Sequence, residues 1–283
     1  MTHFLALAGV LAISFSAVFI RLAAVSPVTA TFYRALYAVP VLAALSMITR
    51  ADDHRARRAR ALALVSGVIL AFDLGFWHES IALIGAGLAT VIANIQVVFV
   101  AVAGWVLYKE RPSLPTFVII AGVLVGIALT SGFARPNAYG ANPVLGVVLG
   151  AAAGACYAGF LLTFRAANRL RGPTAGPLLD STIGTVLGAL LVSPLDPHFA
   201  FAPTWPAHGW LIALALVSQV VGWLLISTAL PRLPAVETSI LLLGQPVFAV
   251  IWGQMFFGEH LSPIQWMGTA RVLGGVATIS RRP

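Results

Sequence analysis

Ten stretches of about 20 mostly apolar residues follow one another along this chain of 283 residues. They cover residues 3–22, 29–49, 61–80, 86–107, 114–132, 144–166, 175–193, 209–230, 235–257 and 262–280. A helix of about 20 residues crosses the hydrocarbon core of a bilayer. The connections between the stretches are too short to form a soluble domain. We therefore expect an all-α integral membrane protein in which ten transmembrane helices form one domain, residues 1–283.

Charged residues are too scarce for a soluble protein. Asp, Glu, Lys and Arg make up 9% of the chain and apolar residues 59%, whereas a soluble chain contains about 25% charged residues. This excludes a cytosolic enzyme, and the single cysteine, Cys156, excludes a secreted disulfide scaffold. The net charge of +8 does not indicate nucleic-acid binding, because the basic residues lie in short runs between the apolar stretches. We expect no nucleic-acid partner.

The distribution of Lys and Arg predicts the orientation in the membrane. About 13 of the 17 basic residues lie in the even-numbered connections and the C-terminal tail, and cytoplasmic loops carry the excess of Lys and Arg. We therefore expect both termini in the cytoplasm. The basic residues concerned are Arg50, Arg55, Arg57, Arg58, Arg60, Lys109, Arg111, Arg165, Arg169, Arg171, Arg232, Arg281 and Arg282.

An internal repeat is visible at an offset of 149 residues, where Gln96 aligns with Gln245 and Gly104 with Gly253. About twelve identities fall in about fifty aligned positions. Five spans precede the second copy, and because five is odd the two copies cross the membrane in opposite directions. We expect repeats at 1–142 and 143–283, related by a pseudo-two-fold axis and enclosing a central cavity. This architecture favours a transporter over an enzyme.

The repeated segments resemble a known family. The stretches SFSAVFIRLA and YRALYAVPVL, and the pair GWVLYKERPS and GQMFFGEHLS, are similar to the drug/metabolite transporter superfamily in its EamA-type ten-helix branch. FWHES, ACYAGF and VGWLLI resemble aromatic amino-acid exporters of the YddG type. The resemblance implies a bacterial inner-membrane exporter whose termini are cytoplasmic and whose substrates include amino acids, aromatic and other apolar ones among them, and related small metabolites.

The third span carries the most polar residues. Asp73, Trp77 and Ser80 lie at i, i+4 and i+7 and so share one helix face, with Glu79 and His78 beside it. Ionisable groups at bilayer depth need a partner or an aqueous cavity. One interpretation makes Asp73, Trp77, His78 and Glu79 the wall of a substrate cavity. The other places Trp77, His78 and Glu79 at the outer membrane interface.

Other spans offer further candidates. Pro246 follows Gln245 and Gly244, so a bend is expected in the ninth span. The fourth and ninth spans both contain polar side chains. These side chains either line the cavity or form hydrogen bonds between helices. The sixth and eighth spans offer aromatic and amide groups that line the cavity or pack in the core. These candidates are Asn94, Gln96 and Gln245, and Tyr157, Gln219 and Trp223.

Two arginines lie inside spans. Arg34 matches the second-span arginine that is characteristic of EamA-type proteins, and the resemblance implies a structural role. Arg271 has no counterpart at the repeat offset, where Gly122 stands. Arg271 pairs with a buried carboxylate (Asp73, Asp180 or Glu79) or binds a substrate carboxylate. Glu110 and Glu259 lie at span ends and are expected to brace loops.

The sequence contains no phosphate-binding loop, no His/Cys set with metal-ligand spacing and no nucleophile–base motif. We expect no cofactor, no metal and no catalytic residue, and a transport process driven by a gradient. His78, Glu79 and Asp73 suggest protons as a coupling partner, beside the amino-acid substrate and the lipid bilayer. Two alternatives stay open: an intramembrane enzyme acting on a lipid-linked substrate, and a passive channel.

Overall fold

The computed structural model describes residues 2–109, 111–130, 142–168, 172–202, 204–258 and 262–280. Every regular element within these ranges is helical. In chain order they are α1 (Thr2–Ser14), α2 (Ser16–Ala23), α3 (Pro27–Ile48), η1 (Arg50–Asp52), α4 (Arg57–Ala93), α5 (Gln96–Tyr108), α6 (Leu114–Thr130), α7 (Pro143–Ala167), α8 (Ala175–Val192), η2 (Ser193–Leu195), α9 (Ala207–Ala213), the π-helix η3 (Leu214–Gly222), α10 (Trp223–Ala229), η4 (Leu230–Arg232), α11 (Ala235–Leu242), α12 (Gly244–Phe257) and α13 (Pro263–Ser280).

Seven helical segments are long and apolar enough to cross a membrane: Thr2–Ala23, Pro27–Ile48, Arg57–Ile81, Val144–Ala167, Ala175–Leu195, Ala207–Arg232 and Ala235–Phe257. Two shorter apolar helices, Gln96–Leu107 and Leu114–Leu129, lie between the third and fourth of these. Together with α13, these segments follow the ten predicted spans in order. The predicted all-α fold with ten transmembrane helices is confirmed.

Local sequence signals explain where several helices begin. Ser26 caps α3 by accepting a hydrogen bond from the Thr29 backbone N–H at 3.3 Å, and Pro27 occupies the first turn. Asn142 caps α7 in the same way, with Pro143 at the first helical position. A proline there costs no hydrogen bond, because the first N–H groups of a helix have no partner within the helix. Both caps lie directly before apolar runs of spanning length.

The helix α4 contains a sharp bend that joins the third and fourth spans. A Cβ built on Gly150 of α7 would lie 3.0 Å from Ser80 Oγ and 3.1 Å from Ile92 Cγ2. In a straight helix residues 80 and 92 are about 18 Å apart, because each residue rises by about 1.5 Å. The chain therefore reverses direction between Ser80 and Ile92. The sequence predicts a connection there, and the structure makes the reversal within one helical run.

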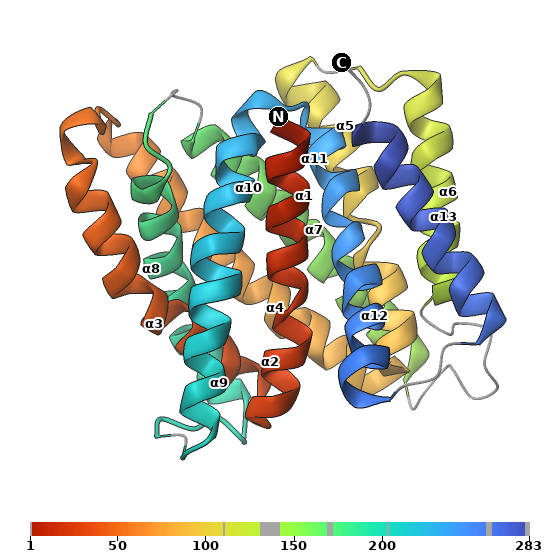
Figure 1. The fold of residues 1–283 in the computed structure, drawn as a ribbon, viewed down its shortest axis with the longest axis horizontal. Helices are drawn as coiled ribbons and strands as arrows, with labels where there is room; N and C mark the ends of the chain where they lie inside the picture. The colour runs from red at the N-terminus through yellow and green to blue at the C-terminus, as the bar shows by residue number, and fades with distance from the viewer. Residues whose placement is uncertain are drawn as a thin grey trace.

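The basic connections and the two ends of the fold lie together. In Figure 1, α1 begins and α13 ends at the upper end of the molecule. The connections α3–α4, α5–α6 and α10–α11 lie at this same end, and they contain basic residues such as Arg55, Lys109 and Arg232. The basic residues of these three connections therefore lie on one side of the helical bundle.

Glycines allow α4 and α8 to approach closely. A Cβ built on Gly67 would lie 1.8 Å from the carbonyl oxygen of Ser181, and one on Gly184 would lie 1.9 Å from that of Leu64. Small residues at such crossings are the usual means by which membrane helices pack. Ser66 and Ser181 hydrogen-bond across the crossing at 3.0 Å. The second-half helix α8 is thereby fixed against the first-half helix α4.

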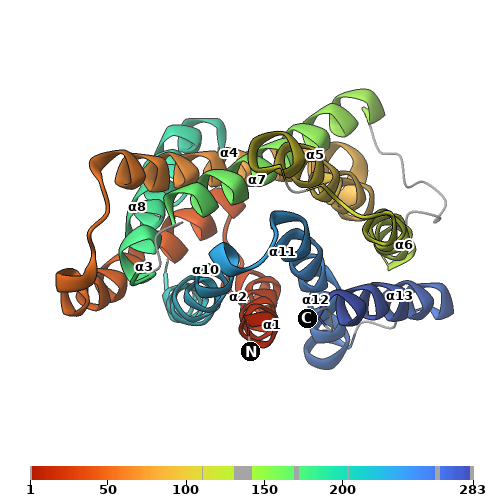
Figure 2. The ribbon, with the colours of Figure 1, turned by 90° about the horizontal axis from the view of Figure 1, so that it is seen from above.

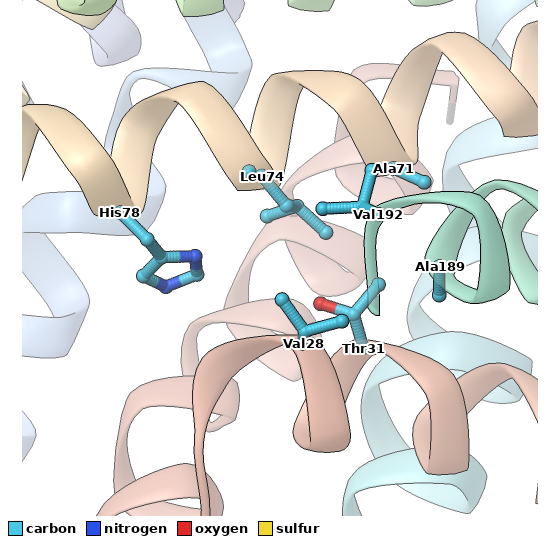
Figure 3. Close-up of a pocket in the computed structure, with 8 residues that line it drawn as sticks. Val28, Thr31, Ala71, Leu74, His78, Ala189 and Val192 are labelled. Atoms are coloured by element: carbon cyan, nitrogen blue, oxygen red, sulfur yellow. The ribbon is translucent and has the colours of Figure 1, made fainter. Parts of the chain in front are cut away.

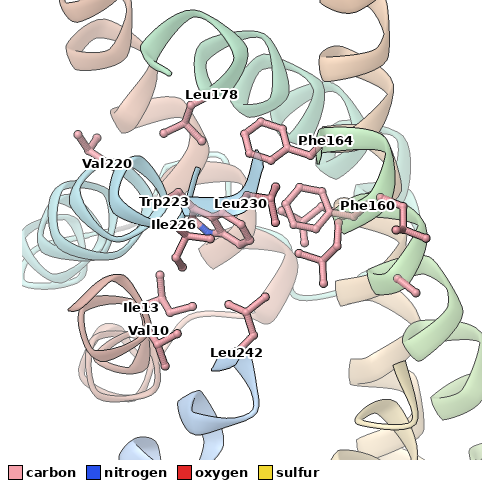
Figure 4. Close-up of a cluster of buried hydrophobic side chains, with 14 of the residues drawn as sticks. Val10, Ile13, Phe160, Phe164, Leu178, Val220, Trp223, Ile226, Leu230 and Leu242 are labelled. Atoms are coloured by element: carbon pink, nitrogen blue, oxygen red, sulfur yellow. The ribbon is translucent and has the colours of Figure 1, made fainter. Parts of the chain in front are cut away.

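Buried apolar side chains from both halves fill the centre of the bundle (Figure 4). Trp223 of α10 is 4% exposed and packs edge-on against Phe160 of α7, with ring centroids 5.0 Å apart. Val10 and Ile13 of α1 belong to the same cluster. Seen from above, α1 lies beside α10 and α6 lies beside α13 (Figure 2). The two halves of the chain therefore share one apolar core.

Candidate functional site

A chain of buried hydrogen bonds connects α3, η3 and α8. Arg34 donates from Nε to Gln219 Oε1 at 3.2 Å, and Gln219 donates from Nε2 to Thr182 Oγ1 at 3.1 Å. Gln219 is 3% exposed and Thr182 is fully buried. The guanidinium can only donate, so the Gln219 amide must present its oxygen to Arg34 and its nitrogen to Thr182. The amide orientation follows from these contacts.

The π-helix η3 positions Gln219. Its neighbour Ser218 donates from Oγ to the Ala12 carbonyl of α1 at 3.2 Å, while Gln219 turns toward Arg34 and Thr182. Successive side chains of η3 thus contact α1 on one side and α3 and α8 on another. A π-helix is rare and is frequently found at functional sites. The sequence gives no signal for it, because hydrophobic periodicity does not distinguish nine π-helical residues from an α-helix.

Asp73, Trp77 and Ser80 share one face of α4, as predicted, and this face covers α7. Ser80 Oγ donates to the Gly146 carbonyl at 2.7 Å, and Trp77 packs in an apolar cluster that includes Ala151. Asp73 lies within electrostatic range of Tyr157. These contacts run in opposite chain directions along the two helices, as expected for antiparallel packing. The polar face of the third span is therefore directed into the protein.

Asp73 and Arg34 are ionisable groups without an ion-pair partner in the described part of the chain. Asp73 is 8% exposed, and its carboxyl forms no hydrogen bond or ion pair with any residue that the structure describes. The two terminal nitrogens of Arg34 likewise form no hydrogen bond within the described ranges. Tyr157 lies within electrostatic range of both residues. We call Arg34, Asp73, Tyr157, Thr182 and Gln219 the polar cluster. Its members come from both halves of the chain.

His78 lines a small pocket between α3, α4 and α8 (Figure 3). The pocket has a volume of about 10 Å³, which is about the space that one water molecule needs. His78 Nδ1 is buried without a hydrogen-bond partner among the residues described. This pocket is too small for an amino acid in the conformation seen here. Its lining residues are Val28, Thr31, Ala71, Leu74, Gly75, His78, Ala189 and Val192.

The fourth and ninth spans are both interrupted, at positions that the repeat offset relates. The first interruption is the turn at Asn94 and Ile95, and the second is at Leu243. The second interruption lies three residues before Pro246, in the part of the ninth span where the sequence predicts a bend. Gln96 opens α5 and Gln245 lies at the start of α12. Gln96 is 2% exposed, and its Oε1 has no hydrogen-bond partner in the described part of the chain.

Three further candidates have surroundings of other kinds. Glu79 is exposed. Trp223 packs in the apolar core, which is the alternative that the sequence left open. Arg271 lies on an exposed face of α13 and donates from Nε to the Gly122 carbonyl at 3.0 Å. Glu110 and Glu259, expected to brace loops, lie outside the described residues.

One of the two interpretations of Arg271, an ion pair with Asp73, Asp180 or Glu79, is wrong. The Asp180 carboxylate instead accepts from Arg55 Nη1 at 3.0 Å and lies 3.5 Å from Arg60 Nε. The physical reason is the direction of the arginine: its position on α13 turns it toward the backbone of α6, not toward the interior. The polar residues within one span do not show which neighbouring helix each side chain contacts.

Sequence reasoning missed Thr182 and the role of Arg34 as a partner of Gln219. The available signal was the demand of a buried amide for two partners, which makes every polar residue of the neighbouring spans a candidate. Thr182 lies in the polar stretch DST at the start of the seventh span. Only the packing of α8 against α3 and η3 identifies which of these residues Gln219 meets.

Comparison with known proteins gives relatives along most of the chain. An uncharacterized transporter, YwfM of Bacillus subtilis, is 26% identical over 81% of this chain and 76% of its own length. An uncharacterized transporter of Synechocystis, sll1319, is 25% identical over 77% of this chain and 66% of its own length. The threonine/homoserine exporter RhtA of Salmonella typhimurium is 30% identical over 49% of this chain and 47% of its own length.

A solved crystal structure has the same fold, with a TM-score of 0.80 over 98% of this chain and 95% of that one, at 18% sequence identity. The model of the EamA-like transporter family matches residues 1–132 and again residues 144–281. Two matches in tandem agree with the repeat seen at an offset of 149 residues. The chain belongs to the EamA-like transporter family of the drug/metabolite transporter superfamily.

Proposed function

We propose that this transporter exports amino acids, including aromatic and other apolar ones, by alternating access around the polar cluster. The observation that carries the proposal is the composition of the cluster. Arg34 and Asp73 come from the first half of the chain, and Tyr157, Thr182 and Gln219 come from the second. A site shared by two halves changes its exposure when the halves move relative to one another.

The interrupted spans support the same proposal. Unwound backbone and half-helix ends are tolerated at membrane depth where they face protein or a cavity, and they form the binding sites of several transporter folds. We propose that Asn94, Gln96 and Gln245, with Pro246 at the second break, lie along the path of the substrate. Trp77 and His78 extend this path on α4 toward the end of the molecule opposite the termini.

The exporter RhtA supports the amino-acid class, since its name gives threonine and homoserine as its substrates. The aromatic preference rests on the sequence patterns of the third, sixth and eighth spans. Efflux of all standard amino acids from proteoliposomes tests both statements. Saturable efflux of at least one amino acid is expected. Folded protein that moves none of them would contradict the proposal, and efflux confined to small polar amino acids would contradict the aromatic part.

The orientation is also a proposal: both termini in the cytoplasm of a bacterial cell and the protein in the inner membrane. A cysteine-free Cys156→Ala background allows single cysteines to report it. Ala51 lies exposed in the α3–α4 connection and Ala202 lies exposed in the α8–α9 connection. A membrane-impermeant maleimide added to intact spheroplasts is expected to label Ala202→Cys and not Ala51→Cys. The reverse labelling would overturn the orientation.

We further propose that protons drive the export, through Asp73 and His78. Both side chains lie on α4 within the membrane-spanning part, and neither has an ion-pair partner among the residues described. The test is efflux from proteoliposomes with and without an imposed pH gradient. Acceleration by the gradient in the wild type, lost in Asp73→Asn, is expected. Efflux that does not respond to the gradient would contradict proton coupling.

A further inference from the structure

The polar cluster holds a guanidinium group and a carboxyl group that form no ion pair with each other. Gln219 binds Arg34 through Nε alone, and Asp73 forms no ion pair within the described residues. An isolated charge in an apolar interior is strongly unfavourable, and ionisable groups in membrane spans are usually paired with each other or placed at a pathway. An arginine and an aspartate of one cluster, without ion-pair partners among the described residues, therefore indicate a ligand that supplies a partner for each of them.

The geometry of Arg34 specifies the negative end of such a ligand. A guanidinium presents two edges that can bind a carboxylate with two parallel hydrogen bonds. The Gln219 oxygen occupies Nε, and Gln219 is itself held by Thr182 at 3.1 Å. The edge formed by the two terminal nitrogens is left without a partner. This edge matches the two oxygens of a carboxylate, and the hydrogen bond at Nε keeps the planar group oriented.

Asp73 specifies the positive end. It lies on the face of α4 that covers α7 and is flanked in sequence by Leu70 and Leu74, which pack in the apolar core cluster together with Tyr157. A carboxylate accepts hydrogen bonds from an ammonium group, which donates three. Tyr157 lies within electrostatic range of both Asp73 and Arg34. A ligand that meets both groups needs a carboxylate for Arg34 and an ammonium group for Asp73, and a zwitterion carries both.

We propose that Arg34 binds the α-carboxylate and Asp73 binds the α-ammonium group of a zwitterionic amino acid. The inference rests on the proposed function and deepens it, because it assigns the substrate class to two named side chains. Recognition then depends on the part that all α-amino acids share. Side-chain preference would be decided elsewhere along the path, so the same pair serves aromatic, apolar and hydroxylated amino acids.

Binding of three matched probes to the full chain in detergent micelles tests the proposal by calorimetry. The probes are L-phenylalanine, 2-phenylethylamine, which lacks the carboxylate, and 3-phenylpropionate, which lacks the ammonium group. L-threonine, 1-aminopropan-2-ol and 3-hydroxybutyrate form a second set. The wild type is expected to bind at least one amino acid about tenfold or more tightly than either of its analogues, because each analogue leaves one buried charge unpaired.

The two variants are expected to fail in complementary ways. Arg34→Gln loses the preference for the amino acid over the amine and keeps the preference over the acid. Asp73→Asn loses the preference over the acid and keeps that over the amine. Arg271→Gln and Glu79→Gln, which change an arginine and a carboxylate outside the cluster, keep both preferences. Weakening of all three probes by the same factor would overturn the proposal and assign both residues a structural role.

The outcomes separate this inference from the proposed function. A wild type that binds neither amino acid would contradict the proposed function itself. A wild type that binds one of them, with variants that retain its full selectivity, contradicts only the assignment of Arg34 and Asp73. If Asp73→Asn does not fold, Asp73→Glu carries the test: moving the carboxylate by one methylene is expected to weaken the amino acid and the amine relative to the acid. Unchanged ratios would overturn the proposal.

Discussion

Arg271 donates its Nε hydrogen bond to the carbonyl oxygen of Gly122, the residue that stands at its own position in the first repeat. The same helices meet through a second pair of related contacts. A Cβ built on Gly126 would lie 2.8 Å from Val272 Cγ2, and one on Gly275 would lie 2.3 Å from Val123 Cγ2. The offset of 149 residues exchanges these two contacts. The α6–α13 crossing therefore lies on the pseudo-two-fold axis predicted from the repeat.

This crossing predicts opposite effects for two glycine substitutions. In Gly126→Ala the new methyl group also meets the Gly268 carbonyl oxygen at 2.9 Å, and backbone yields less readily than a side chain. We expect a lower midpoint of thermal unfolding in detergent, corresponding to about 1–3 kcal/mol. Gly274→Ala on the same helix pair meets nothing within 4 Å and is expected to raise the midpoint slightly, because alanine favours helix. Equal midpoints would show that the crossing tolerates separation.

The connection between α3 and α4 is held by a charge cluster at the end that carries the termini. Arg55 donates from Nε to Asp53 Oδ1 at 2.8 Å and from Nη1 to Asp180 Oδ2 at 3.0 Å. Without Arg55, the carboxylates of Asp53 and Asp180 lose a hydrogen-bond donor although both are largely buried. We expect Arg55→Gln to lower the free energy of unfolding by about 2–4 kcal/mol. Arg58→Gln, an exposed arginine nearby, is expected to change it little.

The same cluster predicts a pH dependence. The hydrogen bond from Arg55 holds the pKa of Asp53 below its ordinary value. A carboxyl whose pKa is lower in the folded than in the unfolded state stabilises the fold above the unfolded pKa, and this contribution is lost as the pH falls through the folded value. The difference in unfolding midpoint between wild type and Asp53→Asn should be present at pH 7 and shrink below about pH 4. A difference that grows on acidification would contradict this assignment.

Much of the fold was predictable because a bilayer allows few solutions. Helices such as α8, at Ala175–Val192, and the pair α11–α12, at Ala235–Phe257, nearly coincide with the predicted ranges 175–193 and 235–257. Length and hydropathy suffice there, since each spanning segment must satisfy its own backbone. The break at Phe15 between α1 and α2 has no proline or glycine to mark it. Its position depends on packing, which the sequence shows only indirectly.

Within the candidate site, the helix face that a residue occupies was predictable from the sequence, and the contacts between helices were not. Helical periodicity placed Asp73, Trp77 and Ser80 on one face, since that needs only the geometry of one helix. The partner of Gln219 and the direction of Arg271 depend on which helices become neighbours. Helices far apart in sequence make these contacts, as α3 and η3 do for Arg34 and Gln219. Local patterns contain no information about that.

Trp223 allows the two open interpretations of an interior tryptophan to be separated. It packs edge-on against Phe160 and against Phe164, with centroids 5.0 Å and 6.3 Å away, and it is almost fully buried. Trp223→Ala is expected to cost about 3–5 kcal/mol of stability. Trp223→Phe keeps most of the apolar volume and is expected to retain efflux of phenylalanine and threonine at near wild-type rates. Efflux lost in a stable Trp223→Phe would instead place the indole in the substrate path.

Gln96 predicts a separation of stability from transport. Its side-chain oxygen is buried without a hydrogen-bond partner in the described chain, and such a group costs about 1–3 kcal/mol. A functional role is one reason for a native protein to keep such a group, and we expect Gln96 to have one in transport. Gln96→Leu removes the carbonyl at similar volume, so we expect a higher unfolding midpoint together with efflux reduced severalfold or more.

Gln245 is the matched position in the second repeat, at the start of α12, and it is only partly buried. Gln245→Leu relieves a smaller desolvation cost, so its unfolding midpoint should rise less than that of Gln96→Leu. If both amides contact the substrate or the moving helix ends, both variants lose efflux despite their different stabilities. Proteoliposome efflux and thermal unfolding of the same preparations decide the matter. A Gln96→Leu protein that is more stable and transports normally would remove the fourth-span break from the substrate path.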